Sequence, residues 1–466
     1  MIMKKSIILL SAALAFIACN KETPVKESAS GISKIVFNVD INRADDTKGV
    51  KAGWENGDKV YVFFQGLVGD NKYAVFTYNG TSWDKNANDI TAKDIFDAKV
   101  DYGDRLTAIC VPYGDQPTFS PSGDSFTMTN KVQTFYLSAS TTYSTGIVEE
   151  STIEIGASLK MKAPDNLIQI CVQGTGGKPA SGNEFVLTVN NVKPFTVEEI
   201  VPGSPVSCTT GTVNFPLPAL LTYVNKDPGY YFWGILDNAS AGAIDYNFQL
   251  VQQNVEKKYA VSSRSKKVSG KELTGSAAIK LTGLTDNGNF VSLGYSGCPL
   301  WATGNIDKTH SKIVDPLEAG EYFRYGLTEP YSSSQTDYTG TEDPLDTSAD
   351  VANSVNTAWR IPTKDQFDAL INDSNTTTAW KTGWTDIGTT KGGGFITSKV
   401  NGISLFFAAA GFYESGSPYV AGGGGFYWSS TPGNTSKPYL LVIDSGNIVT
   451  NVDDRYEGFS VRPVQN

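Results

Sequence analysis

Short apolar runs, each followed by a turn sequence, recur along most of this chain, and their spacing favours strands over helices. Ile35, Phe37, Val39 and Ile41 occupy every second position, which is the pattern of a strand with one buried face. The run Tyr73–Tyr78 is followed directly by Asn79-Gly80, a strong signal for a tight hairpin. The 46 glycines and the 11% of aromatic residues fit the same turn-rich β architecture.

Length and charge narrow the classes of protein to which the chain can belong. At 466 residues it exceeds what one hydrophobic core normally holds, so we expect two or three domains. The net charge of −10 argues against a nucleic-acid surface, which needs clustered Lys and Arg. With the single histidine His310, a zinc site with two histidine ligands is excluded, and any Ser-His-Asp triad would depend on that residue.

The first residues have the pattern of an export signal. Two lysines precede an apolar run at residues 7–17, which is too short to span a bilayer, and Cys19 follows this run closely. The position of Cys19 resembles the bacterial lipoprotein signal, which implies a signal peptide at residues 1–18, lipid on Cys19 and an outer-membrane location. An ordinary signal peptide with an incidental cysteine is the other interpretation. Residues 19–32 are polar and without periodicity, and we interpret them as a linker.

The other cysteines do not indicate a redox or metal site. No Cys-x-x-Cys motif is present, so neither a zinc ribbon nor a thioredoxin-like pair is predicted. Cys110 and Cys171 lie inside apolar runs, where burial as small hydrophobic residues is favoured. An exported protein can also form disulfides. The sequence leaves open the pairing of Cys110, Cys171, Cys208 and Cys298.

A Trp-containing turn after the first strand carries a family resemblance. The segment Gly53-Trp-Glu-Asn-Gly-Asp58-Lys-Val-Tyr-Val-Phe63 leads from this turn into an apolar strand. Together with the lipoprotein signal, the linker and the alternating first strand, it resembles the fimbrillin family of Bacteroidetes, whose members assemble surface pili. The resemblance covers about residues 33–285. It implies two β-sandwich domains, at residues 33–158 and 159–285.

The same resemblance implies a route of assembly. In that family a trypsin-like protease cuts the lipidated precursor after a basic residue near the first strand, and a strand of a neighbouring subunit fills the groove that remains. Such addition is favourable because an unpaired strand edge offers backbone hydrogen bonds and alternate pockets set the register. Arg43 is the expected cleavage position and Lys48 the second choice, so the processed chain would begin at Ala44. An ordinary arginine on a surface turn is the other interpretation.

The character of the sequence changes from Val291 onward. The motifs that follow in order include Trp301-Ala-Thr303, Trp359-Arg-Ile-Pro-Thr363, Tyr427-Trp-Ser-Ser430 and Gly458-Phe-Ser-Val-Arg-Pro-Val464. This series resembles the major paralogous domain first noted in Fibrobacter, a relative of the C-type-lectin-like fold, and implies such a domain at residues 290–466. Thr363 and Gln366 have capping-box spacing and predict a short helix at about residues 364–372. Trp359, Trp428 and Val461 are expected in the core.

The predicted fold class is therefore mainly β, with two fimbrillin-like β-sandwich domains followed by an α+β C-type-lectin-like domain. We find no set of residues in the sequence that is typical of a catalytic site. Calcium-dependent lectins of this fold use Glu-Pro-Asn or Gln-Pro-Asp and a Trp-Asn-Asp triplet. Glu329-Pro330-Tyr331 has the wrong third residue and lies too early in the domain, and Trp428-Ser429-Ser430 has hydroxyls, which bind calcium poorly, in place of two of the ligands. The acidic stretch at residues 337–350 is another place where calcium could bind, but it lacks EF-hand spacing and a solvated loop is favoured. We predict a protein that is not an enzyme and has no cofactor or metal.

A long aromatic and glycine-rich segment at residues 411–425 lies where this fold usually places its recognition surface. Exposed tyrosine suits such a role because it combines a large contact area with a polar tip. A second lip is expected at residues 453–456, and a loop without any ligand is the other interpretation. The candidate contact residues are Tyr413, Glu414, Tyr419, Asp453, Asp454, Arg455 and Tyr456.

These patterns predict a pilus-associated surface lipoprotein, a tip or minor subunit with an adhesive C-terminal domain. The expected partners are other pilus subunits through strand donation, a host or bacterial surface protein or glycan, and the outer membrane through the lipid of the precursor; nucleic acid is not expected. The alternative is a monomeric lipid-anchored surface protein that binds glycans for nutrient capture. Cleavage after Arg43 would favour assembly, and an intact chain linked through Cys19 would favour capture.

Overall fold

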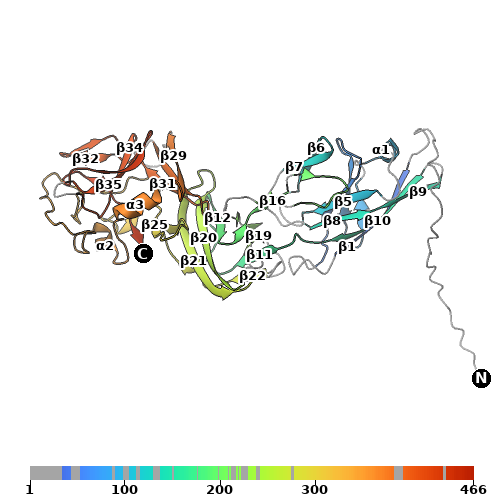
Figure 1. The fold of residues 1–466 in the computed structure, drawn as a ribbon, viewed down its shortest axis with the longest axis horizontal. Coiled ribbons are helices and arrows are strands. Elements are labelled where there is room, and N and C mark those ends of the chain that lie inside the picture. The colour runs from blue at the N-terminus through green and yellow to red at the C-terminus, as the bar shows by residue number, and fades with distance from the viewer. Residues whose placement is uncertain are drawn as a thin grey trace, which may run out of the picture.

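The computed structural model shows a chain of β-sheets with few and short helices (Figure 1). It describes residues 34–43, 53–86, 90–97, 104–111, 116–129, 137–149, 152–175, 177–197, 199–207, 209–210, 217–218, 220–221, 229–237, 242–273, 278–382, 392–433 and 437–465. The predicted mainly β class is confirmed. The predictions for the signal peptide, the linker, Cys19, Ala44, Lys48 and Cys208 lie outside these residues.

The first part of the chain forms three sheets around one hydrophobic core. Buried side chains from all three sheets, such as Phe63, Ile155 and Phe126, belong to this core. A short helix, α1 (Ala92–Asp97), lies beside them. In hydrogen-bonded order the sheets are β1 (Lys34–Arg43), β10 (Thr152–Met161) and β9 (Ser144–Glu149); β4 (Trp83–Lys85), β3 (Tyr73–Tyr78), β2 (Lys59–Phe64), β5 (Arg105–Cys110) and β8 (Leu137–Thr142); and β15 (Glu199–Ile200), β7 (Ser125–Thr129) and β6 (Thr118–Ser122).

The second part of the chain is a sandwich of two sheets. Ile170 and Phe232 from one sheet and Leu187 and Leu250 from the other share a buried apolar cluster. Besides a small pair, β14 (Phe195–Thr196) with β16 (Thr209–Thr210), the sheets are β13 (Val192–Lys193), β19 (Tyr230–Leu236), β11 (Leu167–Val172) and β22 (Ala278–Leu281), with β18 (Leu220–Leu221) also on β19; and β17 (Leu217–Pro218), β12 (Asn183–Val189), β20 (Ile244–Asn254), β21 (Ala260–Lys271) and β23 (Thr285–Asp286).

These two parts exchange segments. The expected boundary after residue 158 falls inside β10, and β15 returns from the second part to pair with β7 of the first. Arg105 and Ser140 hold the chain beyond β15, because both donate hydrogen bonds to the carbonyl of Gly203, at 3.0 and 3.3 Å. The division into domains at 33–158 and 159–285 stays a prediction.

The C-terminal region combines several small sheets with two short helices, α2 (Val351–Val355) and α3 (Lys364–Leu370). The capping box of Thr363 and Gln366 begins α3, as predicted, and Trp359, Trp428 and Val461 are buried. The sheets are β24 (Phe290–Ser292), β25 (Leu300–Ala302) and β38 (Val464–Gln465); β26 (Ile306–Asp307) and β27 (Lys312–Ile313); β28 (Tyr322–Phe323), β37 (Phe459–Ser460), β34 (Gly424–Trp428), β35 (Tyr439–Asp444) and β36 (Ile448–Val452); β29 (Thr376–Thr382), β30 (Gly392–Ser398) and β31 (Ser404–Ala408); and β32 (Phe412–Glu414) and β33 (Ser417–Tyr419).

The second sandwich and the C-terminal region share an apolar core. Val251 and Ala260 of the sandwich lie in one cluster with Val291 and Leu293. The side chain of Gln249 in the sandwich also bonds to the backbone of Ser292 in the C-terminal region. Its Nε2 donates to the Ser292 carbonyl at 2.9 Å, and its Oε1 accepts from the Ser292 N–H at 2.6 Å. This junction is therefore packed and hydrogen-bonded.

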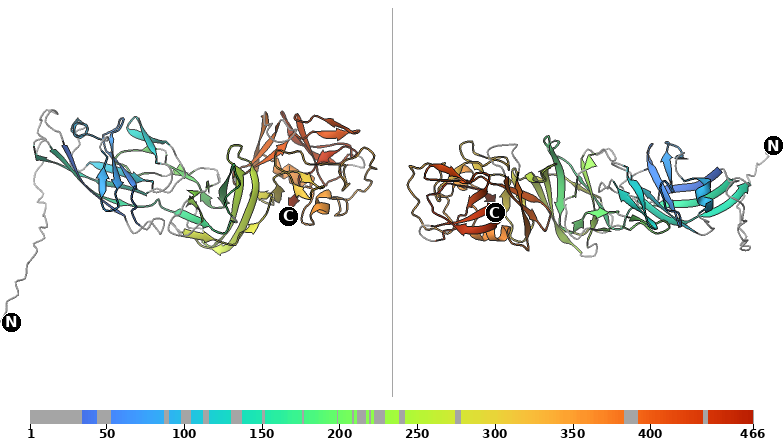
Figure 2. Two further views of the ribbon diagram at one scale, coloured as in Figure 1. Left: turned by 180° about the vertical axis from the view of Figure 1, so that it is seen from behind. Right: turned by 90° about the horizontal axis from the view of Figure 1, so that it is seen from above.

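The molecule is elongated, with the first part at one end and the C-terminal region at the other (Figures 1 and 2). The strand β32 lies at the end far from β1 and β9 (Figure 1). Within the described residues, no helix has the length and apolar character needed to cross a membrane.

Candidate functional site

The segment expected as a loop at residues 411–425 is largely a hairpin of β32 and β33. Ser415 and Gly416 connect the two strands, and both have positive φ, at 48° and 86°. Two consecutive residues of positive φ make the type I′ turn that matches the natural twist of paired strands. Glu414 and Ser417 flank this turn as a register pair. The predicted contact residues of this segment are thus presented on a defined scaffold.

Phe412 fixes the hairpin to the core. Its ring centroid lies 4.9 Å from that of Phe426 and 5.6 Å from that of Phe459, both in the five-stranded C-terminal sheet. The ring of Tyr419 stacks on Phe412 with a centroid distance of 5.6 Å. Aromatic pairs at these separations contribute beyond the area that they bury. Tyr419 is therefore positioned by a chain of ring contacts although it is 46% exposed.

The second predicted lip, residues 453–456, lies beside the hairpin. Tyr413 and Gly458 form a backbone bridge, with N–H to carbonyl distances of 2.9 and 2.8 Å in the two directions. A Cβ on Gly458 would stand 2.5 Å from the ring of Tyr331, so this close approach requires glycine. The structure therefore brings Tyr413 and Glu414 together with the segment that contains Asp453 and Tyr456.

Large apolar side chains gather on this surface. Six are markedly exposed among the described residues, and Tyr419, Val420 and Tyr456 are three of them, at 46%, 53% and 39%. The hydroxyl of Tyr456 donates to Asp454 Oδ2 at 3.2 Å, and Lys437 forms an ion pair with the same oxygen at 3.2 Å. Clustered exposed aromatic residues are more typical of a binding surface than single ones.

Two predicted contact residues are less accessible than expected. Arg455 is buried, because its guanidinium donates to the carbonyl of Tyr338 and stands 5.7 Å from the ring centre of Tyr325. Tyr413 is half-buried between the rings of Tyr322 and Tyr331, at 5.0 and 5.4 Å. Both residues support the surface from within. Of the remaining five, Tyr419 and Tyr456 are exposed, and Glu414, Asp453 and Asp454 are half-buried.

Sequence reasoning missed Glu457, which is 4% exposed and lies behind the second lip. Its Oε2 has no hydrogen-bond partner among the described residues. Burial, together with the nearby carboxylates of Glu414, Asp453 and Asp454, raises the pKa of Glu457 to about 7. No local pattern marks this residue, since its burial depends on the contact between Gly458 and the distant Tyr413.

The raised pKa of Glu457 predicts a pH-dependent stability. The folded protein holds this proton more tightly than the unfolded chain, whose carboxyl has the ordinary value of 4.5, so stability falls as the pH rises from 4.5 to 7. Glu457→Gln, which is neutral throughout, is expected to raise Tm at pH 8 by about 2–4 °C and to make little difference at pH 4. Calorimetry at both pH values measures this, with the exposed Glu256→Gln as control; equal pH profiles for wild type and Glu457→Gln would contradict it.

The acidic stretch at residues 337–350 contributes structural contacts. Asp337 pairs at 2.8 Å with the buried Arg324, and Asp346 accepts from the N–H of Ser348 at 2.7 Å. Asp350 is buried and acts as the N-cap of α2. Among the described residues, no three side chains of His, Cys, Asp or Glu lie together in a way that could hold a metal ion.

Asp350 is expected to contribute strongly to stability. Its Oδ1 accepts from Ala352 N at 2.8 Å and its Oδ2 from Ile361 N at 2.9 Å, so it links the helix to the strand-like segment that follows. We expect Asp350→Ala to cost about 2–3 kcal/mol, because it removes a cap and leaves buried N–H groups unpaired. Urea unfolding of the full chain measures the loss. The exposed Asp373→Ala is the control, and equal losses in both variants would overturn the assignment.

A second candidate site is β1 at the opposite end of the molecule. It pairs in parallel with β10 over its whole length, from Lys34 with Thr152 to Arg43 with Met161, and it forms the edge of its sheet. Ile41 is buried, while Phe37 packs edge-on against Phe76 at 5.7 Å. The polar residues between them, such as Asn38, are exposed. Since β1 ends at Arg43, a cut after this residue would separate the complete strand from the chain that follows.

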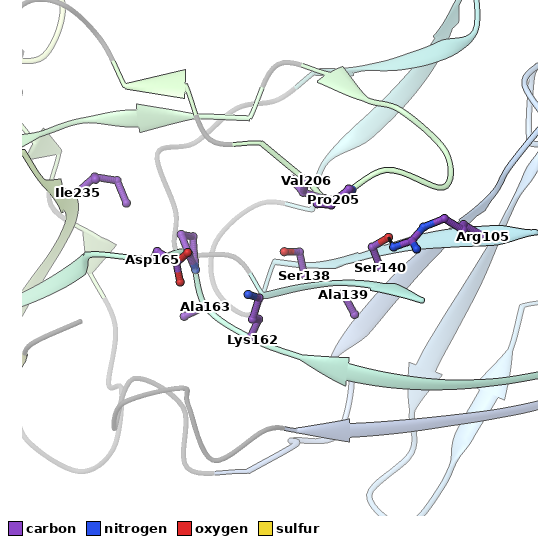
Figure 3. Close-up of a pocket in the computed structure, with 11 residues that line it drawn as sticks. Arg105, Ser138, Ala139, Ser140, Lys162, Ala163, Asp165, Pro205, Val206 and Ile235 are labelled. Carbon is purple, nitrogen blue, oxygen red and sulfur yellow. Dashed lines mark hydrogen bonds between the residues drawn. The ribbon is translucent and has the colours of Figure 1, made fainter. Parts of the chain in front are cut away.

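The hollow of about 480 Å³ in Figure 3 lies where the first and second parts meet. Arg105 and Ser140 point toward one another across its wall, and the guanidinium donates to the hydroxyl at 3.0 Å. Pro205 and Val206 form the facing side. Because its Arg105 is already bonded to Ser140 and to the chain at Gly203, we interpret this hollow as a structural junction.

No family model matches the chain, and no curated protein matches its sequence. Among solved structures, a fimbrial protein from Bacteroides ovatus is similar at 10% identity, covering 94% of this chain and 99% of its own, with a TM-score of 0.20. The fimbrial anchor protein Mfa2 from Porphyromonas gingivalis is similar at 11% identity, covering 49% of this chain and 81% of its own, with a TM-score of 0.21. Scores of this size are too low to assign a common fold.

Proposed function

We propose that this protein is an exported surface lipoprotein that becomes an assembly subunit when a protease cuts after Arg43. In this proposal a strand from another subunit replaces β1 on β10, and the C-terminal surface remains available for adhesion. The processed chain begins at Ala44, and the lipid on Cys19 belongs to the precursor. The position in a pilus is that of a tip or minor subunit.

The observation that carries this proposal is the pairing of β1. A strand at the sheet edge can leave without breaking the pairs between the other strands, and it exposes the ten residues of β10 that faced it. An unpaired strand edge is a ready template for another chain. The alternation of apolar Phe37, Val39 and Ile41 defines the pockets that an incoming strand would have to fill.

The C-terminal surface supports the adhesive part of the proposal. The exposed side chains of Tyr419, Val420 and Tyr456 belong to the C-terminal surface. The strand β32 of this surface lies at the end of the molecule that is far from β1 (Figure 1). A ligand bound there leaves β10 accessible to another subunit. This separation suits a tip, where one end joins the assembly and the other meets a target.

The N-terminus of the protein in surface material from its native host tests the proposal. Mass spectrometry is expected to find chains that begin at Ala44. A lipid-modified Cys19 as the sole N-terminus would overturn the assembly role.

The second candidate, a monomeric lipid-anchored binder of glycans, would then be favoured. It has one observation in its support, because the uncut chain already forms a complete pairing of β1 with β10.

A further inference from the structure

Four carboxyl groups from two segments converge at the C-terminal surface. The backbone bridge of Tyr413 with Gly458 brings these segments together. Asp453, Asp454 and Glu457 belong to one short segment, the bridge brings Glu414 to it, and each of the other three carboxylates raises the pKa of Glu457. We call this group the acidic cluster, and its members are Glu414, Asp453, Asp454 and Glu457.

The carboxylates of the acidic cluster outweigh the positive charge of Arg324 at Glu457. Lys437 pairs with Asp454 at 3.2 Å. Arg324 opposes the other carboxylates at Glu457, but each of them has a larger effect there than Arg324 has. Like charges held at short range repel, and a positive group between them removes the repulsion. A cation bound at this surface would therefore relieve the repulsion between the carboxylates.

Glu457 is an independent indication of a ligand. A carboxylate that is 4% exposed normally has partners for both oxygens, because an unpaired buried acceptor costs free energy. Its Oε2 has none among the described residues, and its largest interactions after burial are with the acidic cluster. The orphaned oxygen therefore marks where a donor is missing.

The surroundings of the cluster favour an organic cation. No three of its acidic groups are arranged to hold a metal ion, within the described part of the chain. Tyr456 is exposed, bonds to Asp454 and senses the charge of Glu414, so an aromatic face stands beside the carboxylates. Aromatic faces attract Lys and Arg, and carboxylates bond to them with charge assistance.

We propose that the acidic cluster, with Tyr419 and Tyr456, binds lysine or arginine side chains of a partner protein. The acidic groups extend over two chain segments, and the exposed Tyr419 and Val420 continue the surface, which suits a polypeptide better than a small amine. This inference rests on the proposed adhesive role of the C-terminal surface, and it names the class of ligand for that surface.

Binding is expected to strengthen as the pH rises through 7. Ionisation of Glu457 adds negative charge to the site in this range, and a bound cation favours the ionised form. The charged groups with the largest effect on Glu457 are the other three members of the acidic cluster and Arg324. The buried Arg455 stands two residues before Glu457 in the same segment. Lys437 acts on the site through Asp454.

The test uses the uncut full-length chain, so that its result does not depend on cleavage after Arg43. Immobilised protein is exposed to a blocked peptide of alternating Lys and Gly, and to matched peptides with Gln or Glu in place of Lys. We expect the Lys peptide to bind with an affinity that falls as salt is added, and the other two not to bind.

The decisive variant combines Glu414→Gln, Asp453→Asn and Asp454→Asn. It is expected to weaken binding of the Lys peptide by at least about tenfold. The control neutralises three exposed carboxylates elsewhere, with Asp70→Asn, Asp124→Asn and Glu256→Gln, and it has the same net charge. A second variant, Glu457→Gln, is expected to bind the Lys peptide at pH 6 like wild type. It should lack the increase in affinity that wild type shows at pH 8.

Equal weakening in the two triple variants would overturn the proposal, because net charge alone would then explain binding. Binding of neutral glycans without binding of the Lys peptide would also overturn it, while leaving the adhesive role in place. A native N-terminus at Cys19 would instead remove the assembly role and leave the result of the peptide experiment unaffected.

Discussion

Replacing Arg462 by Met is expected to destabilise the C-terminal region by about 3–5 kcal/mol, because a fully buried guanidinium holds separate parts of the fold together. Its Nε donates to Asn305 Oδ1 at 2.9 Å, and its other nitrogens donate to the carbonyls of Ala302 at 3.2 Å and Phe406 at 3.0 Å. The group also stands 4.4 Å from the ring centre of Phe407. Burial lowers the pKa of Arg462 to about 10, so it stays charged at neutral pH.

Urea unfolding followed by tryptophan fluorescence measures this loss, since Trp301 and Trp428 are buried in the same region. Arg462→Lys is expected to recover little, because one ammonium group cannot reproduce the planar fork of the guanidinium. Arg264→Met is the matched control: its contact with Asp286 is exposed and long, at 3.5 Å, and should contribute less than about 1 kcal/mol. An unchanged unfolding midpoint in Arg462→Met would refute the prediction.

A chain in which Arg43 and Lys48 are both replaced by Gln is expected to lose nearly all assembly in the native host. Arg43 and Lys48 are the two cleavage positions expected from the sequence, so without them β1 is expected to stay on the edge of β10. The next basic residue is Lys51, and an N-terminus at Ala52 would show that cleavage had moved there. Size-exclusion chromatography of sheared surface material measures the assembled fraction, and mass spectrometry reads the N-terminus.

The control for this experiment is the exposed Lys178→Gln, which removes a basic residue from the second part of the chain. It should assemble like wild type and begin at Ala44. Assembly of the double variant at the wild-type level would contradict the prediction, because polymerisation would then not depend on cleavage at Arg43 or Lys48. A third chain that keeps Arg43 and carries Lys48→Gln tests which of the two positions is cut.

Local signals in the sequence predicted local structure well. The spacing of Thr363 and Gln366 predicted α3, and Asn79-Gly80 predicted the turn between β3 and β4. Both depend on residues a few positions apart, where turn and capping preferences decide the conformation. The Ser415-Gly416 turn was missed because serine is a weaker signal for positive φ than asparagine.

Long-range features could not be read in this way. A charged residue such as Arg462 is expected at the surface, and its burial depends on acceptors that lie more than fifty residues away in sequence. The parallel pairing of β1 with β10 likewise joins segments far apart in the chain. Of the predicted contact residues, Tyr419 and Tyr456 are exposed, and their role in binding stays a prediction. The unpartnered carboxyl of Glu457 depends on tertiary contacts, which no local pattern shows.

The packed junction between the second sandwich and the C-terminal region has a mechanical consequence. In the proposed adhesive role, a bound target would pull on the hairpin of β32 and β33, and this force would pass through the junction. The shared cluster of Val251 and Val291, and the paired bonds of Gln249 with Ser292, resist swivelling there. The second sandwich and the C-terminal region are thus expected to move together as one rigid unit. The second sandwich would then set the direction in which the C-terminal surface faces, also under the pull of a bound target.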